Sequence, residues 1–157
     1  MKRLHRALAV SAAAVSTVAL SACSFFSPVQ TDVAYNPGDG VPAQKGTVAA
    51  RNLVLIAEQK GGPANLTGAV LNLGDQEVKV GFLTRIQSEA GQSAELFTVP
   101  GRGSVAISGV EFGELAKDDG PGTVTEVVMV TPDGKVLVKV PVQVPGEGPY
   151  KTLAPKG

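Results

Sequence analysis

The 157-residue sequence contains one cysteine, one histidine and no tryptophan, and each shortage removes a class of function. The histidine is His5, so the chain beyond its first few residues has no imidazole. Without imidazole it cannot form a Ser/His/Asp triad, a Cys/His dyad or a histidine metal site. Because Cys23 is the only cysteine, no disulfide can form within the chain, and the fold must be held by burial alone.

Aromatic residues and basic charge are also scarce. Between residues 46 and 145 the aromatic residues are Phe82, Phe97 and Phe112, too few to build both a core and a stacking platform for sugars or bases. Basic and acidic residues number 14 each, but three of the basic ones precede residue 7. The remaining chain is mildly acidic, so we expect no binding to nucleic acid or to anionic headgroups through a basic surface.

The first 22 residues have the layout of a secretory signal peptide. The basic residues Lys2, Arg3 and Arg6 precede an uncharged, mostly apolar run at positions 7–20. This run is shorter than the roughly 20 residues that a permanent transmembrane helix needs. We therefore expect it to direct export and then to be removed.

The four residues Leu20, Ser21, Ala22 and Cys23 resemble the bacterial lipobox, in which an aliphatic and two small residues precede a cysteine. The resemblance implies that Cys23 is alkylated with diacylglycerol and becomes the mature N-terminus. The alternative is an ordinary signal peptide with a chance cysteine. Two acyl chains suffice for stable attachment, so we expect a lipid-anchored protein on the extracytoplasmic face of the cell membrane.

Residues 24–45 are expected to form a flexible tether. They contain three prolines and two glycines among small polar residues and show no sustained hydrophobic period. A random coil of this length spans roughly 25 Å. The predicted organisation is a signal peptide at 1–22, a lipidated N-terminus and tether at 23–45, a β-domain at 46–145 and a C-terminal tail at 146–157.

From residue 46 onward, short alternating segments rich in β-branched residues predict an all-β, seven-stranded sandwich. The alternation is clearest at 135–144, and the turn Pro132-Asp133-Gly134 joins this segment to 123–131 in a hairpin. Only residues 110–117 are expected to form a helical turn. The seven strands are predicted at 47–57, 65–73, 77–86, 95–99, 103–108, 123–131 and 135–144.

Four segments of this predicted sandwich together resemble a known family of domains. They are a first long strand, Gly68-Ala69-Val70-Leu71-Asn72-Leu73-Gly74-Asp75, Val99-Pro100-Gly101-Arg102-Gly103-Ser104-Val105, and the closing hairpin from Pro132 to Val142. The arrangement resembles the periplasmic copper chaperone domain (PCuAC, DUF461-type), in the divergent form of actinobacterial lipoproteins. The resemblance implies an immunoglobulin-like or cupredoxin-like sandwich. In the copper-binding branch of that family, His and Met side chains hold Cu(I) and deliver it to oxidase assembly.

The two stretches that carry copper ligands in that family correspond here to residues 82–86 and 109–116. Neither contains a histidine or a methionine. Met129 lies within an apolar strand, and we interpret it as a core side chain and not as a thioether ligand. We therefore predict no metal ligand and no other cofactor.

The remaining candidate groups carry no specific motif. Asp118 and Asp119 could offer oxygens to Ca²⁺, but adjacent carboxylates do not make an alternating ligand loop, and a solvated turn is the preferred interpretation. Glu111 and Glu114 share a face only if 110–117 is helical. Serines near turns, which no motif marks as nucleophiles, are Ser88, Ser93, Ser104 and Ser108. We predict no catalytic residue.

These expectations favour a lipid-anchored, non-enzymatic binding or accessory module at the cell envelope. Its expected partners are the membrane, through the lipid on Cys23, and an unidentified envelope protein. The alternative is a metal-related accessory lipoprotein that keeps a copper chaperone's role through a partner or a cryptic site. A hydrolase that uses Ser/Lys or carboxylates is a third hypothesis, and no motif supports it.

Overall fold

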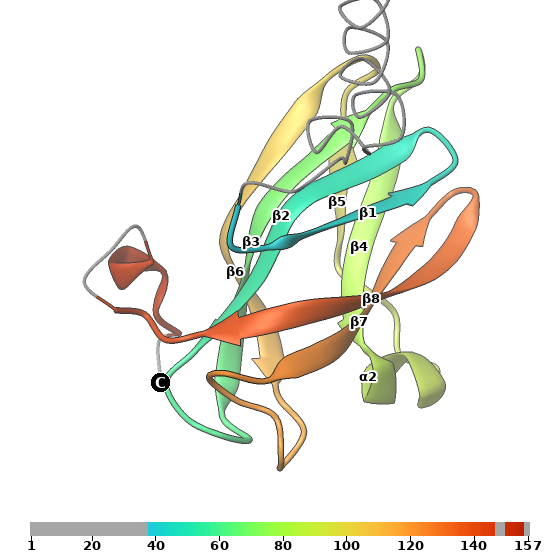
Figure 1. The fold of residues 1–157 in the computed structure, drawn as a ribbon. Helices are drawn as coiled ribbons and strands as arrows, with labels where there is room; N and C mark the ends of the chain where they lie inside the picture. Colours follow the sequence, from blue (N-terminus) through green and yellow to red (C-terminus); the bar gives the residue numbers. More distant parts are fainter. Residues whose placement is uncertain (1–37, 147–149, 156–157) are drawn as a thin grey trace, which may run out of the picture. The chain divides into compact units, whose positions relative to one another are not determined.

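The computed structural model describes residues 38–146 and 150–155. They fold almost entirely into β-strands (Figure 1). The strands are β1 (Val41–Lys45), β2 (Val48–Ala57), β3 (Pro63–Asn72), β4 (Val78–Thr84), β5 (Leu96–Val99), β6 (Ser104–Glu114), β7 (Val124–Thr131) and β8 (Gly134–Gln143). A short helix, α2 (Arg85–Glu89), follows β4, and a 3-10 turn, η2 (Lys151–Leu153), lies in the C-terminal tail.

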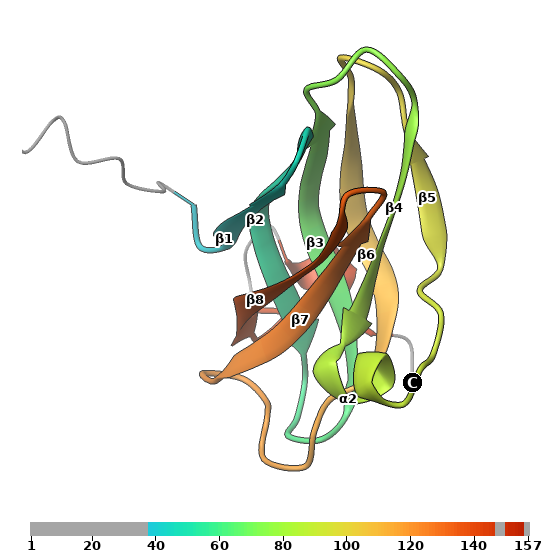
Figure 2. The same cartoon turned by 90° about the vertical axis from the view of Figure 1, so that its right-hand side faces the viewer.

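The strands form one nearly closed sheet in the order β5-β4-β7-β8-β2-β3-β6. Strands β1 and β8 share one edge of β2: β1 pairs antiparallel with its first half, and β8 pairs parallel with Leu55 and Ile56. Every other pairing is antiparallel. In Figure 2, β1 and β8 lie on one side of the domain, and β5 and β6 lie on the opposite side. The predicted all-β architecture is confirmed.

The inward-facing side chains form one apolar core. Alternation along β7 turns Val127 and Met129 inward, and β8 contributes Val140; all three are fully buried. Strand β2 adds a continuous buried run from Leu53 to Ala57 because it is covered on both faces. Burying one such aliphatic side chain contributes roughly 1.5–3 kcal/mol, so burial can hold this fold without a disulfide.

The sheet begins earlier than the sequence predicts. Residues 41–45, expected within the tether, form β1 and pair with β2, which gives eight strands instead of seven. Pro42 is typical of a loop, so the sequence does not predict this strand, but proline is compatible with a strand that pairs on one edge only. A second device fixes the segment before β1: Asn52, at a bulge of β2 with φ of 52°, accepts a hydrogen bond from the Gly40 amide (2.8 Å).

The helical turn expected at 110–117 is wrong. Strand β6 continues to Glu114 and pairs with β3 along its length. Gly109 and Gly113 have φ values of 64° and 97°, which few other residues adopt, and the pairing register shifts at two places nearby. These bulges break the two-residue alternation, so the segment does not look like a strand in the sequence.

The helix lies instead directly after β4, and its first two residues overlap the end of the strand predicted at 77–86. Thr84 ends the strand and begins α2 through a capping box: its hydroxyl accepts from the Gln87 amide (3.0 Å), and the Gln87 side chain accepts from the Thr84 amide (2.9 Å). The sequence carries this Thr-x-x-Gln signal. The apolar residues Phe82 and Leu83 before it extended the predicted strand over the signal.

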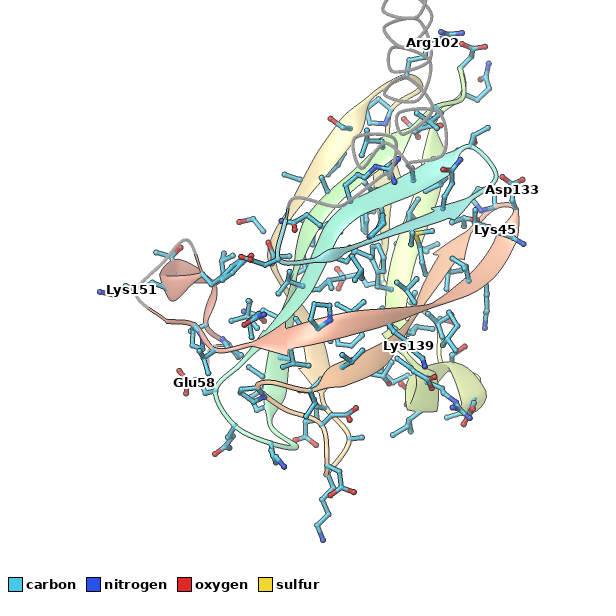
Figure 3. The ribbon with its side chains drawn as sticks, viewed as in Figure 1. Lys45, Glu58, Arg102, Asp133, Lys139 and Lys151 are labelled. Atoms are coloured by element: carbon cyan, nitrogen blue, oxygen red, sulfur yellow. The ribbon has the colours of Figure 1, made fainter. Side chains whose placement is uncertain are left out.

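The C-terminal tail packs back on the domain. The Asn65 side chain, on β3 and 8% exposed, donates hydrogen bonds to the carbonyl oxygens of Leu153 (3.0 Å) and Ala154 (3.2 Å). At the start of the tail, the Tyr150 hydroxyl donates to a carboxylate oxygen of Asp39 (3.0 Å). Lys151 points outward from this segment (Figure 3). The tail is therefore held at both ends of its described part.

Candidate functional site

The predicted lipobox and lipidation residues Leu20, Ser21, Ala22 and Cys23 lie outside the described residues, so lipidation stays a prediction. Within residues 38–146 and 150–155, no helix is both long enough and apolar enough to cross a membrane.

The two stretches in which the resemblance places copper ligands do come together. Phe82 and Phe112 line one cleft, and Thr84 and Ala116 line a second cavity at the α2 end of the domain. The family resemblance thus pointed to two stretches that lie close together in the structure, at the ends of β4 and β6. These four residues are apolar or hydroxylic, and Arg85 and Glu111 add a cation and a carboxylate to the same cavities, so none of them is a soft copper ligand.

The described part of the chain contains no metal site built from His, Cys, Asp or Glu side chains. Its residues include no cluster of three or more His, Cys, Asp or Glu side chains that could hold an ion. Met129 is fully buried in the core, opposite Phe82 in the sheet register, which confirms its interpretation as a core residue. Copper therefore does not fit the donor set of this domain.

The larger cavity, which we call the end cavity, has a volume of about 520 Å³. Arg85 on its wall binds two carboxylates: Nε lies 2.7 Å from Glu89 and Nη1 lies 2.7 Å from Glu126. Hydrogen bonds to Glu126 and Glu89 raise the pKa of the Arg85 guanidinium above its ordinary value. Because two carboxylates already share its charge, Arg85 is a poor anchor for an anionic ligand. Lys139 is the second cation on this wall and lies beside α2 in Figure 3.

The remaining polar groups of the end cavity do not form a catalytic arrangement. Thr125 is 4% exposed, and its hydroxyl has no hydrogen-bond partner among the described residues. Asp119 lines the cavity, whereas Asp118 does not, so the adjacent carboxylates are not presented to one ligand. Glu111 and Glu114, which a helix would have placed together, lie in β6. No two of these groups form the hydrogen-bonded base and nucleophile that covalent catalysis requires.

The smaller cleft, which we call the seam cleft, lies between β5 and β6 and has a volume of about 210 Å³. The rings of Phe82 and Phe97 stack beside it, with centroids 6.0 Å apart and planes 17° apart. Leu96 and Val110 also line it and are 50% and 45% exposed. Its other walls are Leu66, Val105, Ala106, Ile107, Phe112 and the two glutamates Glu95 and Glu111.

The sequence does not predict the seam cleft. It shows Phe82, Phe97 and Phe112 only as too few aromatic residues for both a core and a stacking platform, and all three line this cleft. The turn at 100–103 joins two strands that do not pair with each other, because β5 pairs with β4 and β6 pairs with β3. Only this long-range pairing creates the cleft, and no local pattern carries it.

Solved structures that resemble this fold include three copper-bound or apo PCuAC domains. The copper-bound PCuAC domain from PmoF2 is 20% identical, with a TM-score of 0.52 over 67% of this chain and 99% of that chain. The apo PCuAC domain from PmoF1 is 14% identical, with a TM-score of 0.51 over 67% and 100%. The apo PmoF2 PCuAC domain is 19% identical, with a TM-score of 0.50 over 67% and 96%.

These likenesses confirm a PCuAC-like fold. At such identities they show the fold alone, because one fold hosts many functions. No family model matches the sequence, and no curated protein matches it.

Proposed function

We propose that this protein is a non-enzymatic accessory protein with a copper-chaperone-like role, which it performs through a protein partner and not through copper ligands of its own. The observation that carries the proposal is the combination of a PCuAC-like fold with the seam cleft, whose walls are mostly apolar. The copper-bound and apo PCuAC domains support the copper connection. The one soft donor among the described residues, Met129, is fully buried in the core, and this directs the role toward a partner.

The chemistry of Cu(I) supports the second half of this proposal. Cu(I) prefers thioether, thiolate and imidazole ligands, and carboxylates and carbonyls are hard donors. Beyond residue 22 the chain has one methionine, no histidine and Cys23. Met129 is enclosed by the core, and acylation would occupy the sulfur of Cys23. Transfer of copper to or from this domain is therefore not part of the proposal.

The proposal includes a location. Lipid attached to Cys23 would hold the protein at the extracytoplasmic face of the cell membrane, where a tether would let the domain reach an envelope protein. A mildly acidic chain gives no reason to invoke nucleic acid. The second candidate, favoured by the missing ligands, is a binding module whose envelope partner has no connection with copper.

Two measurements test the proposal. The processed protein, purified with its lipid from the envelope, and its Met129→Leu variant are titrated with Cu(I) against a calibrated chelator, and we expect neither to compete for the metal. One-to-one retention of copper that the variant loses would contradict the partner-only role. Crosslinking in the native envelope then identifies the partner: capture of a copper-handling protein supports the proposal, and reproducible capture of an unrelated protein favours the second candidate.

A further inference from the structure

Two unpaired strand edges face each other across the seam cleft. Among the described strands, β5 pairs only with β4, and β6 pairs only with β3, so the sheet path ends at both. Residues of both strands line the cleft. An edge strand presents alternate backbone N–H and C=O groups that a further strand can bind. One added strand would therefore find two such edges and would close the sheet.

The turn between β5 and β6 holds the seam open. The Arg102 amide donates to the Gly74 carbonyl (2.7 Å), and the Asn72 amide donates to the Gly103 carbonyl (2.9 Å). Arg102, at the tip of the domain in Figure 3, also forms an ion pair with Asp75. These contacts fasten the turn to the neighbouring β3–β4 turn. Each strand therefore stays beside its own partner, and the two edges do not collapse onto each other.

The cleft has the size and polarity of a site for a side chain. Its volume of about 210 Å³ is smaller than the roughly 300–1,000 Å³ of pockets that enclose drug-sized ligands. The stacked pair Phe82 and Phe97 gives it an apolar wall, and the exposed Leu96 and Val110 extend this surface outward. A single aliphatic side chain of an extended segment fits this description.

The charge of the cleft indicates which kind of extended segment it can bind. Glu95 and Glu111 are the charged residues that line it, and no lysine or arginine does. Within the described residues neither carboxylate forms a salt bridge. Basic side chains on either side of the inserted apolar one would meet these two carboxylates, and acidic ones would be repelled.

We propose that the seam cleft binds an extended segment of a partner protein in which aliphatic and basic residues alternate. The segment adds as a strand between β5 and β6, with an aliphatic side chain beside Phe82 and Phe97 and basic side chains beside Glu95 and Glu111. Strand addition of this kind obtains affinity from backbone hydrogen bonds and specificity from side-chain pockets. The inference rests on the proposed function, because it names the surface through which the partner-dependent role would operate.

The test uses two blocked peptides of about eight residues, a length sufficient for one strand. One alternates valine and lysine, and the other alternates valine and glutamate. Binding to the purified full-length protein is followed by amide chemical shifts. We expect the lysine peptide to bind, with the largest shifts in β5 and β6, and the glutamate peptide to bind at least tenfold more weakly.

Leu96→Arg should weaken binding of the lysine peptide at least tenfold, because it places a cation at the mouth of the cleft. Leu137→Arg on β8 is the matched control, since Leu137 is also 50% exposed but lies outside the cleft. Unfolding curves of both variants separate lost binding from lost folding. A Glu95→Gln, Glu111→Gln double variant should lose the preference for lysine over glutamate while it stays folded.

Absence of binding, shifts confined to other strands, or equal binding of the two peptides would each overturn the inference. The inference would also be overturned if a single lysine, blocked at both ends, bound as tightly as the peptide, because that result would indicate a small-molecule site. The proposed function stands or falls separately. Envelope crosslinks to a copper-handling partner that map outside β5 and β6 would preserve it and overturn the strand addition.

Discussion

The rings of Phe82 and Phe97 stack across the pairing of β4 with β5, with their centroids 6.0 Å apart. Strand β5 has four residues and pairs with one neighbour only, so few hydrogen bonds hold it. The stacked pair is therefore a main attachment of β5 to the rest of the sheet, as well as a wall of the seam cleft.

Phe97→Leu should lower the free energy of unfolding by about 1 kcal/mol, because it removes the aromatic pair but keeps an apolar side chain. Phe97→Ala should lower it further, by about 2 kcal/mol, because this partly buried ring loses its apolar contacts as well as the stack. Urea unfolding measures both. Leu137→Ala, at a half-exposed site on β8, should change stability by less than about 0.5 kcal/mol. Equal effects of all three substitutions would contradict this role for Phe97.

Asn65→Ala should release the C-terminal tail, because it removes both hydrogen bonds to Leu153 and Ala154. We expect faster amide exchange at 150–155 and a loss of about 1–2 kcal/mol of stability. Thr67→Val is the matched control: it removes a hydrogen bond to the Ile107 carbonyl (3.1 Å) within the same sheet and leaves the tail contacts in place. Unchanged tail exchange in the Asn65 variant would show that another contact holds the tail.

Tyr150 should respond to alkaline pH. Burial, aided by the hydrogen bond to Asp39, raises the pKa of the Tyr150 phenol above its ordinary value of 10.0. The folded state thus favours the protonated phenol. Its contribution to stability is complete below pH 10 and is lost as the pH rises through the raised pKa.

Phenolate absorbance in a Tyr35→Phe background reports Tyr150 alone, since these are the two tyrosines of the chain. We expect its titration midpoint to lie above that of the unfolded protein. Asp39→Asn should move the midpoint down, because it removes the negative charge that disfavours the phenolate. A midpoint that does not differ between folded and unfolded protein would rule out the contact as a stabilising one.

Cys23→Ser should abolish lipid attachment and shift the protein from the detergent phase to the aqueous phase. Intact mass of the wild-type protein should correspond to a chain that starts at Cys23 and carries diacylglycerol. Ser27→Ala, outside the lipobox, is the control and should partition like the wild type. A wild-type mass without lipid would contradict lipidation and favour the alternative, an ordinary signal peptide.

The sequence predicts those parts of the fold that local patterns encode. The β7–β8 hairpin follows from uninterrupted alternation and from Pro132-Asp133-Gly134, which supplies its own turn chemistry. Strand β1 was missed because Pro42 is typical of a loop, although an edge strand tolerates it. The end of β6 was missed because bulges at Gly109 and Gly113 shift its side-chain period.

The candidate site is harder to predict, because its walls come from strands that are far apart in the sequence. The family resemblance located the meeting of residues 82–86 with 109–116, and the structure brings these stretches together. The opening between β5 and β6 depends on contacts of Arg102 with Gly74 and Asp75 across 27 or 28 positions of the chain. Neither residue type nor spacing marks those contacts.

The full burial of Met129 has a consequence for chemical durability. Methionine and cysteine are the side chains that peroxide and hypochlorous acid attack first, and attack requires access to the sulfur. Residues 38–146 and 150–155 include no cysteine, and their single thioether is shut inside the core. The folded domain should therefore resist oxidation of this sulfur, and its unfolding should expose it.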